Sequence, residues 1–459
     1  MYQKESGWKA ADSALKTRIY DFAEGYKTFL DAAKTERAAV AESVRLAKAQ
    51  GFVDAETKDS FKPGDKVYFV NRHKNVLLAV IGEEPVEAGI HFVIAHIDCP
   101  RVDIKQNPAY CDSGLALLKT HYYGGIKKYQ WTAIPLALYG VVLTKDGKRI
   151  EVSIGDKEGD PVFCITDLLP HLATEQMQKK ATEIVAGEAL NILVGSLPAE
   201  DCEKDAEKEA LLALLGERYG ISEEDFLSAE LEAVPAYNAR DLGFDRGMIA
   251  AYGQDDRVCA YTGLQAIFDL ENPAKTAVCV LTDKEEIGSM GNTGMRSAFF
   301  EYAIAVLLEK TTGQYHELML KRTFRNSKCL SADVAAGFDP TYPETHDKLN
   351  ATFMGRGVAI TKYTGSRGKG GTSDANAEFL FDVRRCFDAE EVFWQCGEMG
   401  KVDFGGGGTI AQYVANLDME VVDCGVPLLS MHAPMEVASK LDVYMAYRAY
   451  KAFFETFGK

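Results

Sequence analysis

The second half of the chain alternates between two hydrophobic patterns. Short apolar runs such as TAVCVL (276–281) and KCLSA (328–332) are typical of buried strands. Between them lie longer segments with helical apolar spacing, such as VCAYTGLQAIFDL (258–270) and AFFEYAIAVLLEK (298–310). This alternation predicts an α/β fold in which helices sandwich a mixed, mostly parallel sheet. In such sheets, ligands collect at the carboxyl ends of the strands.

The N-terminal part of the chain carries both kinds of pattern. Residues 9–50 have helical apolar spacing and predict two short helices. Residues 65–82 alternate apolar and polar positions around a turn at 71–75, which predicts a hairpin. The apolar run HFVIA (91–95) then predicts a buried strand that ends in His96 and Asp98.

The pattern changes between residues 104 and 242. This part contains turn-rich strands such as WTAIPLALYGVVLTKDGKRIEVSIG (131–155), followed by an acidic helical stretch at 198–220. We therefore predict a smaller, β-rich domain at 104–242, inserted into a catalytic domain made of residues 1–103 and 243–459. Two domains also suit a chain of 459 residues, which exceeds what one core usually holds.

Composition and charge exclude several classes of partner. Hydrophobic residues make up 47% of the chain and charged residues 26%, which is ordinary for a globular enzyme. The formal net charge of −17 would repel nucleic acid and anionic membranes, so neither is expected as a partner. The ten cysteines lack the spacing of a disulfide framework or a zinc finger. Because the N-terminus also lacks a secretory signal pattern, we expect a cytoplasmic protein.

Polar residues that can bind metal follow or flank the predicted strands. They are His96 and Asp98, Asp255 and Asp256, Glu285 and Glu286, Asp333, and His432. Each is a weak signal by itself. A single histidine on an apolar strand is more often a hydrogen-bonded core residue, adjacent glutamates are mostly solvated, and paired aspartates before a helix are by default its N-cap.

Taken together, these residues fit a hydrolytic site with two metal ions. Such a site needs histidine and carboxylate ligands, with one carboxylate shared between the two ions. The ligand set that we expect is His96, Asp255, Glu286, Asp333 and His432. Its three carboxylates and one hydroxide would balance the four charges of two Zn²⁺ ions, which avoids the cost of burying unpaired charge.

Two further acids have expected roles beside the metal ligands. Asp98 lies two residues after His96, so both side chains lie on one face of an extended strand and Asp98 can accept the second imidazole N–H. Neighbouring side chains at an extended strand end diverge, so Glu286 would bind metal while Glu285 would accept a proton from the attacking water.

This pattern resembles the aspartyl aminopeptidase family of co-catalytic zinc exopeptidases. The matching stretches occur in family order along nearly the whole chain: AHIDCPR (95–101), YGGI (123–126), QDDR (254–257), DKEEIGS (283–289), SADVA (331–335) and GVPLLSMHAPME (425–436). The resemblance implies that His96, Asp255 and Asp333 hold one metal ion. It implies that Asp255, Glu286 and His432 hold the other, and that Glu285 is the general base.

The resemblance also implies an assembly. In this family a β-rich dimerisation domain interrupts the catalytic domain, and the subunits form a tetrahedral dodecamer with enclosed active sites. The family's inserted domain sends a histidine into the partner's active site, and His171 lies in a similar stretch. A packing or surface histidine remains an equally open interpretation of His171.

The substrate preference is the least determined property. Lys362 and His346 match family positions near the substrate, although a solvated lysine is an open alternative. The segment ADVAAGFDP (332–340) replaces ADMAHAVHP of many members, and SRGKGGTSDANAE (366–378) also departs from the family. These departures leave the metal ligands in place and bear on the family's preference for acidic N-terminal residues.

The function expected from these observations is metal-dependent removal of N-terminal residues from peptides with free N-termini. The metal ions would be zinc, with cobalt or manganese as alternatives, because the same ligands accept all three. A second hypothesis is a two-metal amidohydrolase or deacylase that acts on N-acyl amino acids. A third is a non-enzymatic assembly particle, which would have no need of a paired base and ligand.

Overall fold

The computed structural model describes residues 5–458, which form two compact units. The first unit contains the chain up to Asp98, residues 239–431, and the chain from Glu436 onward. The second unit contains Cys99–Asn238 together with the short segment His432–Met435. The second unit therefore includes a short segment that is distant in sequence from residues 99–238. No change in the sequence pattern marks this segment.

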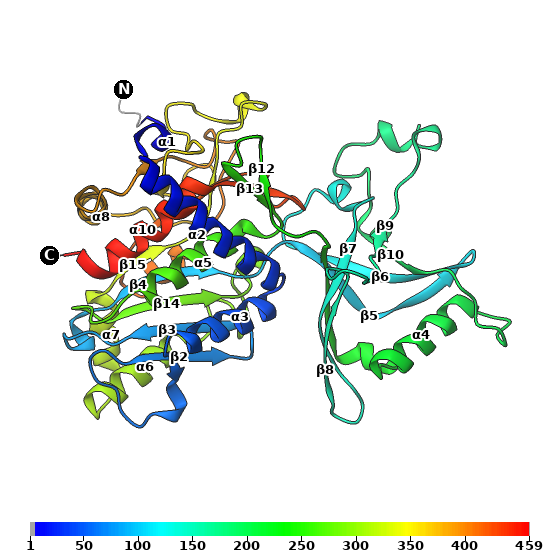
Figure 1. Cartoon of the computed structure of the whole chain (residues 1–459), viewed down its shortest axis with the longest axis horizontal. Coiled ribbons are helices and arrows are strands. Elements are labelled where there is room, and N and C mark those ends of the chain that lie inside the picture. The colour runs from blue at the N-terminus through cyan, green and yellow to red at the C-terminus, as the bar shows by residue number, and fades with distance from the viewer. Residues whose placement is uncertain (1–4, 459) are drawn as a thin grey trace. The chain divides into compact units, whose positions relative to one another are not determined.

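A mixed sheet of nine strands forms the centre of the first unit (Figure 1). Its strands are, in spatial order, β1 (Val53–Asp54), β2 (Lys66–Asn71), β3 (Asn75–Val80), β14 (Ala277–Thr282), β4 (His91–His96), β15 (Lys328–Ser331), β19 (Glu420–Gly425), β17 (Val358–Thr361) and β18 (Trp394–Cys396). The central strands β14, β4, β15 and β19 are parallel, whereas β3 and β17 run antiparallel to their neighbours β14 and β19. The predicted mixed sheet and the predicted hairpin, which is β2–β3, are confirmed.

Helices cover both faces of this sheet. One face packs against α2 (Ser13–Ala32), α3 (Glu36–Ala49), α5 (Gln254–Phe268), α8 (Ala377–Ala389) and α10 (Lys440–Thr456). The other face packs against α6 (Phe299–Thr312), α7 (Glu317–Asn326) and α9 (Ala411–Ala415). Strands with two apolar faces are expected when helices cover both sides. In β4, for example, Val93 and Ala95 join one core, and Phe92 and Ile94 join the other.

The N-terminal helices begin where capping side chains occur. A short helix, α1 (Gly7–Ala10), precedes them. The carboxylate of Asp12 accepts the N–H of Leu15 at the start of α2, and the hydroxyl of Thr35 accepts the N–H of Ala38 at the start of α3. The sequence predicted two short helices here, but α2 is longer than expected, with 20 residues.

A smaller sheet of five strands completes the first unit. It consists of β12 (Arg240–Leu242), β13 (Met248–Ala251), β21 (Glu436–Ser439), β20 (Pro427–Leu429) and β16 (Ala335–Ala336). The strands β20 and β21 pair antiparallel, so the chain between Leu429 and Glu436 is the connecting loop of a hairpin. This loop contains His432.

The second unit is built on an antiparallel sheet. Its seven strands are, in spatial order, β8 (Arg149–Ile154), β7 (Leu136–Leu143), β11 (Ala229–Pro235), β5 (Arg101–Asp112), β6 (Leu115–Tyr123), β10 (Ile192–Gly195) and β9 (Cys164–Ile165). The acidic helical stretch forms α4 (Ala206–Tyr219), in which every side chain keeps some exposure. An apolar cavity of about 570 Å³ lies within this unit and is lined by residues of α4 and of several strands.

Two further findings concern the cysteines and the helices. The ten cysteines are free thiols, as their spacing predicted. Among residues 5–458, the helices are all too short or too polar to cross a bilayer.

A buried carboxylate, Asp442, joins the first turn of α10 to a loop. Its two oxygens accept the N–H groups of Gly355 at 2.7 Å and Gly357 at 2.6 Å. Burial raises the pKa of Asp442 to about 7, although these N–H groups favour the charged form. The carboxyl group of Asp442 therefore keeps its proton in the folded protein up to a pH of about 7, whereas in the unfolded chain, with a pKa near 3.8, it loses the proton at lower pH.

This carboxyl group predicts a pH-dependent contribution to stability. Because its pKa is raised on folding, its contribution is fully present below the unfolded value and is lost as the pH rises through about 7. We expect Asp442→Asn to remove a slope of up to ~1.4 kcal/mol per pH unit from the unfolding free energy between pH 5 and 7. Thermal midpoints of both proteins across this range measure the effect. A midpoint difference that stays constant with pH would contradict it.

Candidate active site

The candidate site lies where three neighbouring parallel strands end. Thr282, the last residue of β14, is opposite His96, the last residue of β4. Ser331, the last residue of β15, is opposite Ile94. Because these strands are parallel, the chain that follows each of them leaves from the same edge of the sheet. The sequence had predicted chemistry at this edge.

His96 is buried and held through both ring nitrogens. Its Nε2 lies 3.1 Å from Oδ1 of Asp255, and its Nδ1 lies 3.0 Å from the carbonyl oxygen of Asp98 and 3.3 Å from the carboxylate of Asp98. Burial lowers the pKa of His96, but the acceptors on Asp255 and Asp98 outweigh it and raise that pKa well above 6.5. An imidazole oriented through Nδ1 presents Nε2 to a cation, which is the usual arrangement of a metal-binding histidine.

Asp255 and Asp256 begin α5, but they do not cap it. The N-cap is Gly253, which has a φ of +72° that favours glycine, and both aspartates have non-helical backbone angles. The peptide bond between them is cis. The default interpretation of this pair as an N-cap is therefore wrong. Instead, the N–H of Asp255 donates to the buried carboxylate of Glu436 at 3.0 Å.

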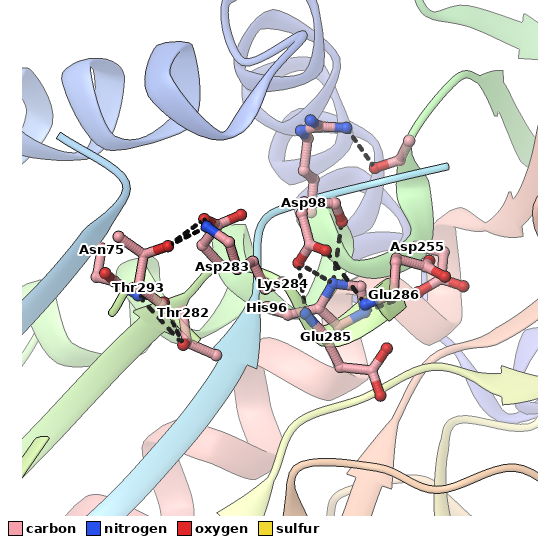
Figure 2. Close-up of polar contacts among 12 residues, drawn as sticks. Asn75, His96, Asp98, Asp255, Thr282, Asp283, Lys284, Glu285, Glu286 and Thr293 are labelled. Atoms are coloured by element: carbon pink, nitrogen blue, oxygen red, sulfur yellow. Dashed lines mark hydrogen bonds and ion pairs between the residues drawn. The ribbon is translucent and has the colours of Figure 1, made fainter. Parts of the chain in front are cut away.

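Asp98 organises the pair of glutamates. Its Oδ1 accepts the N–H of Glu285 at 3.1 Å, and its Oδ2 accepts the N–H of Glu286 at 3.2 Å (Figure 2). The sequence predicted that Asp98 would serve His96, and it did not reveal this second role. Two adjacent backbone N–H groups at the start of a helical turn lack partners within the turn. Their acceptor must therefore come from another segment of the chain, and the sequence does not show which one.

The glutamates also differ in conformation from the expectation. We expected them at an extended strand end, but they lie in a 3₁₀ turn, Glu285–Ile287, that follows Lys284 with its left-handed φ of +68°. The expectation was wrong because β14 ends at Thr282, before the pair. Their side chains leave a tight turn whose backbone Asp98 fixes.

Two groups of side chains in the first unit can each hold a cation. The ligand atoms of His96, Asp255 and Asp333 lie within 4.8 Å of one another, and so do those of His96, Glu285 and Glu286. Asp333 keeps some exposure, but desolvation by the surrounding protein raises its pKa well above 3.8. The nearby His96 lowers this pKa, and the charges of Glu285 and Asp255 raise it further. Carboxylates gathered this closely repel one another unless a cation lies between them. One imidazole with several carboxylates is a donor set that suits zinc.

The four remaining predicted residues belong to neither of these two groups. His432 lies in the second unit, with its Nδ1 2.9 Å from the carbonyl oxygen of Gly125. Lys362 follows β17 and pairs with Asp374, which also binds Lys369. The ring of His346 packs against Phe338 with centroids 5.4 Å apart. His171 is exposed in the 3₁₀ turn Pro170–Leu172.

Behind the proposed ligands lies a layer of buried polar residues, of which the sequence had marked only Asp256, as the neighbour of Asp255. Besides Glu436, this layer contains Gln254, whose amide donates to the carbonyl oxygen of Glu436 at 2.7 Å. It also contains Asp256, whose pKa is raised well above 3.8 by burial and by the negative charge of Asp333. The signal available in the sequence was that all three residues lie within stretches that match the family, QDDR (254–257) and GVPLLSMHAPME (425–436).

Comparisons with known proteins find relatives that match nearly the whole chain. A family model described as aminopeptidase I zinc metalloprotease (M18) matches residues 29–454. A probable M18 family aminopeptidase 1 from Clostridium acetobutylicum is 48% identical over 98% of this chain and 97% of that protein. The crystal structure of an M18 aminopeptidase from Thermotoga maritima superimposes with a TM-score of 0.96 at 44% identity, covering 99% of this chain and 100% of that one. The mApe1 dodecamer of S. cerevisiae shares the fold, with a TM-score of 0.77 at 19% identity, over 95% of this chain and 97% of that one.

The clustered carboxylates predict that metal stabilises the fold. Removal of metal by a chelator should lower the thermal midpoint, because binding to the folded state alone adds about 2.7 kcal/mol at a hundredfold excess over Kd. Added zinc should restore the midpoint. The rise should be smaller in Asp333→Asn and unchanged in the control Asp339→Asn, which alters an equally half-buried aspartate of the same segment. Equal midpoints with and without metal would contradict the prediction.

Proposed function

The chain belongs to the M18 family of zinc metalloproteases and is an aminopeptidase, and from this premise we propose that it works with two metal ions. The observation that carries the proposal is the convergence of His96, Asp255 and Asp333 within 4.8 Å of one another, at the ends of separate elements. We assign these three residues to one ion. We assign Asp255, Glu286 and His432 to the other, with Asp255 shared. When bound, the zinc ions would polarise the scissile carbonyl and lower the pKa of a water.

The place of His432 in the hairpin loop supports its assignment. This loop starts after Leu429 and ends at Glu436, whose carboxylate accepts the N–H of Asp255 at 3.0 Å. The loop is therefore anchored, at one end, next to the ligand that we propose as shared. His432 is four positions before Glu436, so the chain keeps the Cα atoms of the two residues within about 14 Å of each other.

We assign Glu285 as the general base. Asp98 fixes its backbone N–H at 3.1 Å, while one of its carboxylate oxygens lies within 4.8 Å of ligand atoms of His96 and Glu286. A carboxylate beside the metal ligands can accept a proton from the attacking water and then deliver it to the nitrogen of the leaving amine. The acidic surroundings would also attract a free α-amino group, which favours N-terminal residues over internal peptide bonds.

The assembly and the location of the protein extend this proposal. We propose that the second unit mediates dimerisation and that the subunits form a tetrahedral dodecamer. A dodecameric structure of the distant relative mApe1 supports such an assembly, since the two chains share a fold. Insertion of His171 into a partner's active site, substrate contact by His346 and a cytoplasmic location stay predictions.

The base assignment predicts the effect of Glu285→Gln. We expect kcat to fall by about 10²- to 10⁴-fold, because the amide cannot accept the proton. Bound zinc, measured by elemental analysis, should be unchanged. The exposed control Glu309→Gln should keep full activity on aminoacyl fluorogenic substrates. Full activity of Glu285→Gln would contradict the assignment, and equal cleavage of N-acetylated peptides would contradict aminopeptidase action.

The preference for acidic N-terminal residues is a separate prediction. Lys362 and Lys369 together carry two positive charges around the single carboxylate of Asp374, so this cluster has a net positive charge. We expect aspartyl and glutamyl substrates to have a higher kcat/KM than leucyl substrates. Lys362→Met should lower that ratio by removing one charge. A substrate panel in which the ratio is at or below one for the unmodified protein would exclude the preference.

A further inference from the structure

We propose that Lys284 is a positioning residue for the turn that carries Glu285 and Glu286. The inference rests on the proposed function, because it concerns how the proposed base and ligand are held. Lys284 immediately precedes them and has the left-handed backbone conformation that starts their turn. Its side chain leaves the site and ties the turn to a buried polar cluster on the other side, made of Asn75, Thr282, Asp283 and Thr293 (Figure 2).

The side-chain contacts of Lys284 form a closed triangle. Its ammonium donates to the carboxylate of Asp283 at 2.9 Å and to the hydroxyl of Thr293. The hydroxyl of Thr293 in turn donates to the same oxygen of Asp283 at 2.6 Å. Asp283 and Thr293 are each 2% exposed, so this triangle is shielded from water on the side of its acceptors. Contacts of this kind are stronger than surface pairs.

The triangle joins the two ends of the loop that contains both glutamates. The loop that follows β14 starts at Lys284 and ends at Thr293. The ammonium of Lys284 therefore connects the start of the loop to its end. The return is anchored to the sheet, because the amide of Asn75 donates to the carbonyl oxygen of Thr293 and, at 3.2 Å, to the hydroxyl of Thr282. Gly294 allows the close return, since a Cβ there would lie 2.2 Å from the carbonyl oxygen of Ser289.

The turn is therefore held from two sides. Asp98 accepts the N–H groups of Glu285 and Glu286 on one side, and the Lys284 side chain anchors the residue before them on the other. Lys284 also supplies the positive charge next to Asp283, which is buried near the carboxylates of Glu36 and Asp98. Loss of this cation would leave a negative charge without its counter-ion two residues from the proposed base.

The test compares Lys284→Met with Lys275→Met. Lys275 precedes the same strand, has the same 26% side-chain exposure, and pairs with Glu84 at the same distance of 2.9 Å. Four quantities are measured for each variant: kcat and KM at saturating zinc, the zinc dissociation constant by competition with a chromophoric chelator, and the thermal midpoint. Lys284→Arg, which keeps the charge, and Thr293→Val, which removes one acceptor, complete the set.

We expect Lys284→Met to lower kcat or weaken zinc binding by about 10- to 100-fold with little change in KM, the range seen when residues behind metal ligands are replaced. Thr293→Val should act in the same direction, Lys284→Arg should recover most of the loss, and Lys275→Met should match the unmodified protein. If Lys284→Met lowers only the thermal midpoint, or behaves as Lys275→Met does, the positioning role is overturned.

Failure of the proposed function would look different. In that case the unmodified protein would lack peptidase activity at any zinc concentration. A weaker zinc affinity of Lys284→Met would then still support the positioning of Glu286. An unchanged zinc affinity together with an unchanged kcat would overturn the positioning role even if the peptidase activity is established by Glu285→Gln.

Discussion

The structure of this site depends on one electrostatic constraint, which is that carboxylates brought together at the edge of a sheet repel one another unless a cation lies between them. Asp255, Asp333 and Glu286 come from segments far apart in the sequence, and each lies in a ligand group with His96. A fold that brings such residues into proximity gains stability from a bound divalent ion, because the ion converts repulsion into attraction. The same ion would also supply the Lewis acidity that peptide hydrolysis requires.

The elements around the proposed ligands hold these side chains in position. The carboxylate of Glu436 orients Asp255 through its backbone N–H, and Asp98 connects His96 to the turn of Glu285 and Glu286. Each of these supports is buried and comes from a different segment of the chain. Rigid support of this kind matters because a displacement of about 1 Å in a reacting group can reduce turnover a hundredfold. The proposed role of Lys284 extends the same principle to the far side of the turn.

Much of the fold could be predicted from the sequence, because the evidence for it is local. Short continuous apolar runs such as HFVIA identified strands of the sheet, and longer runs with helical spacing identified the helices that cover it. The ligand candidates of the first unit could be predicted as well, since each one ends or flanks an apolar run. The matching family motifs then connected these candidates into one set.

The remaining features could not be predicted, because they depend on contacts between distant segments. Asp98 accepts two backbone N–H groups of residues that are 187 and 188 positions away, and the short turn that places them has no periodic pattern. The Asp255–Asp256 pair was open to interpretation as a helix cap, since aspartates are common there and the sequence does not show that Gly253 takes the N-cap position. The role of Lys284 is hidden for the same reason, because Thr293 approaches it only after the loop has closed.

The most direct measurement is anomalous X-ray diffraction at the zinc edge from crystals of the protein grown with zinc. If the proposed ligands bind two zinc ions, we expect two peaks about 3.5–4 Å apart, with Asp255 between them. The imidazole nitrogen of His96 should lie about 2.0–2.1 Å from one of the two ions. Strong peaks elsewhere on the protein, with none beside His96 and Asp255, would contradict the claim that these side chains converge on a pair of metal ions.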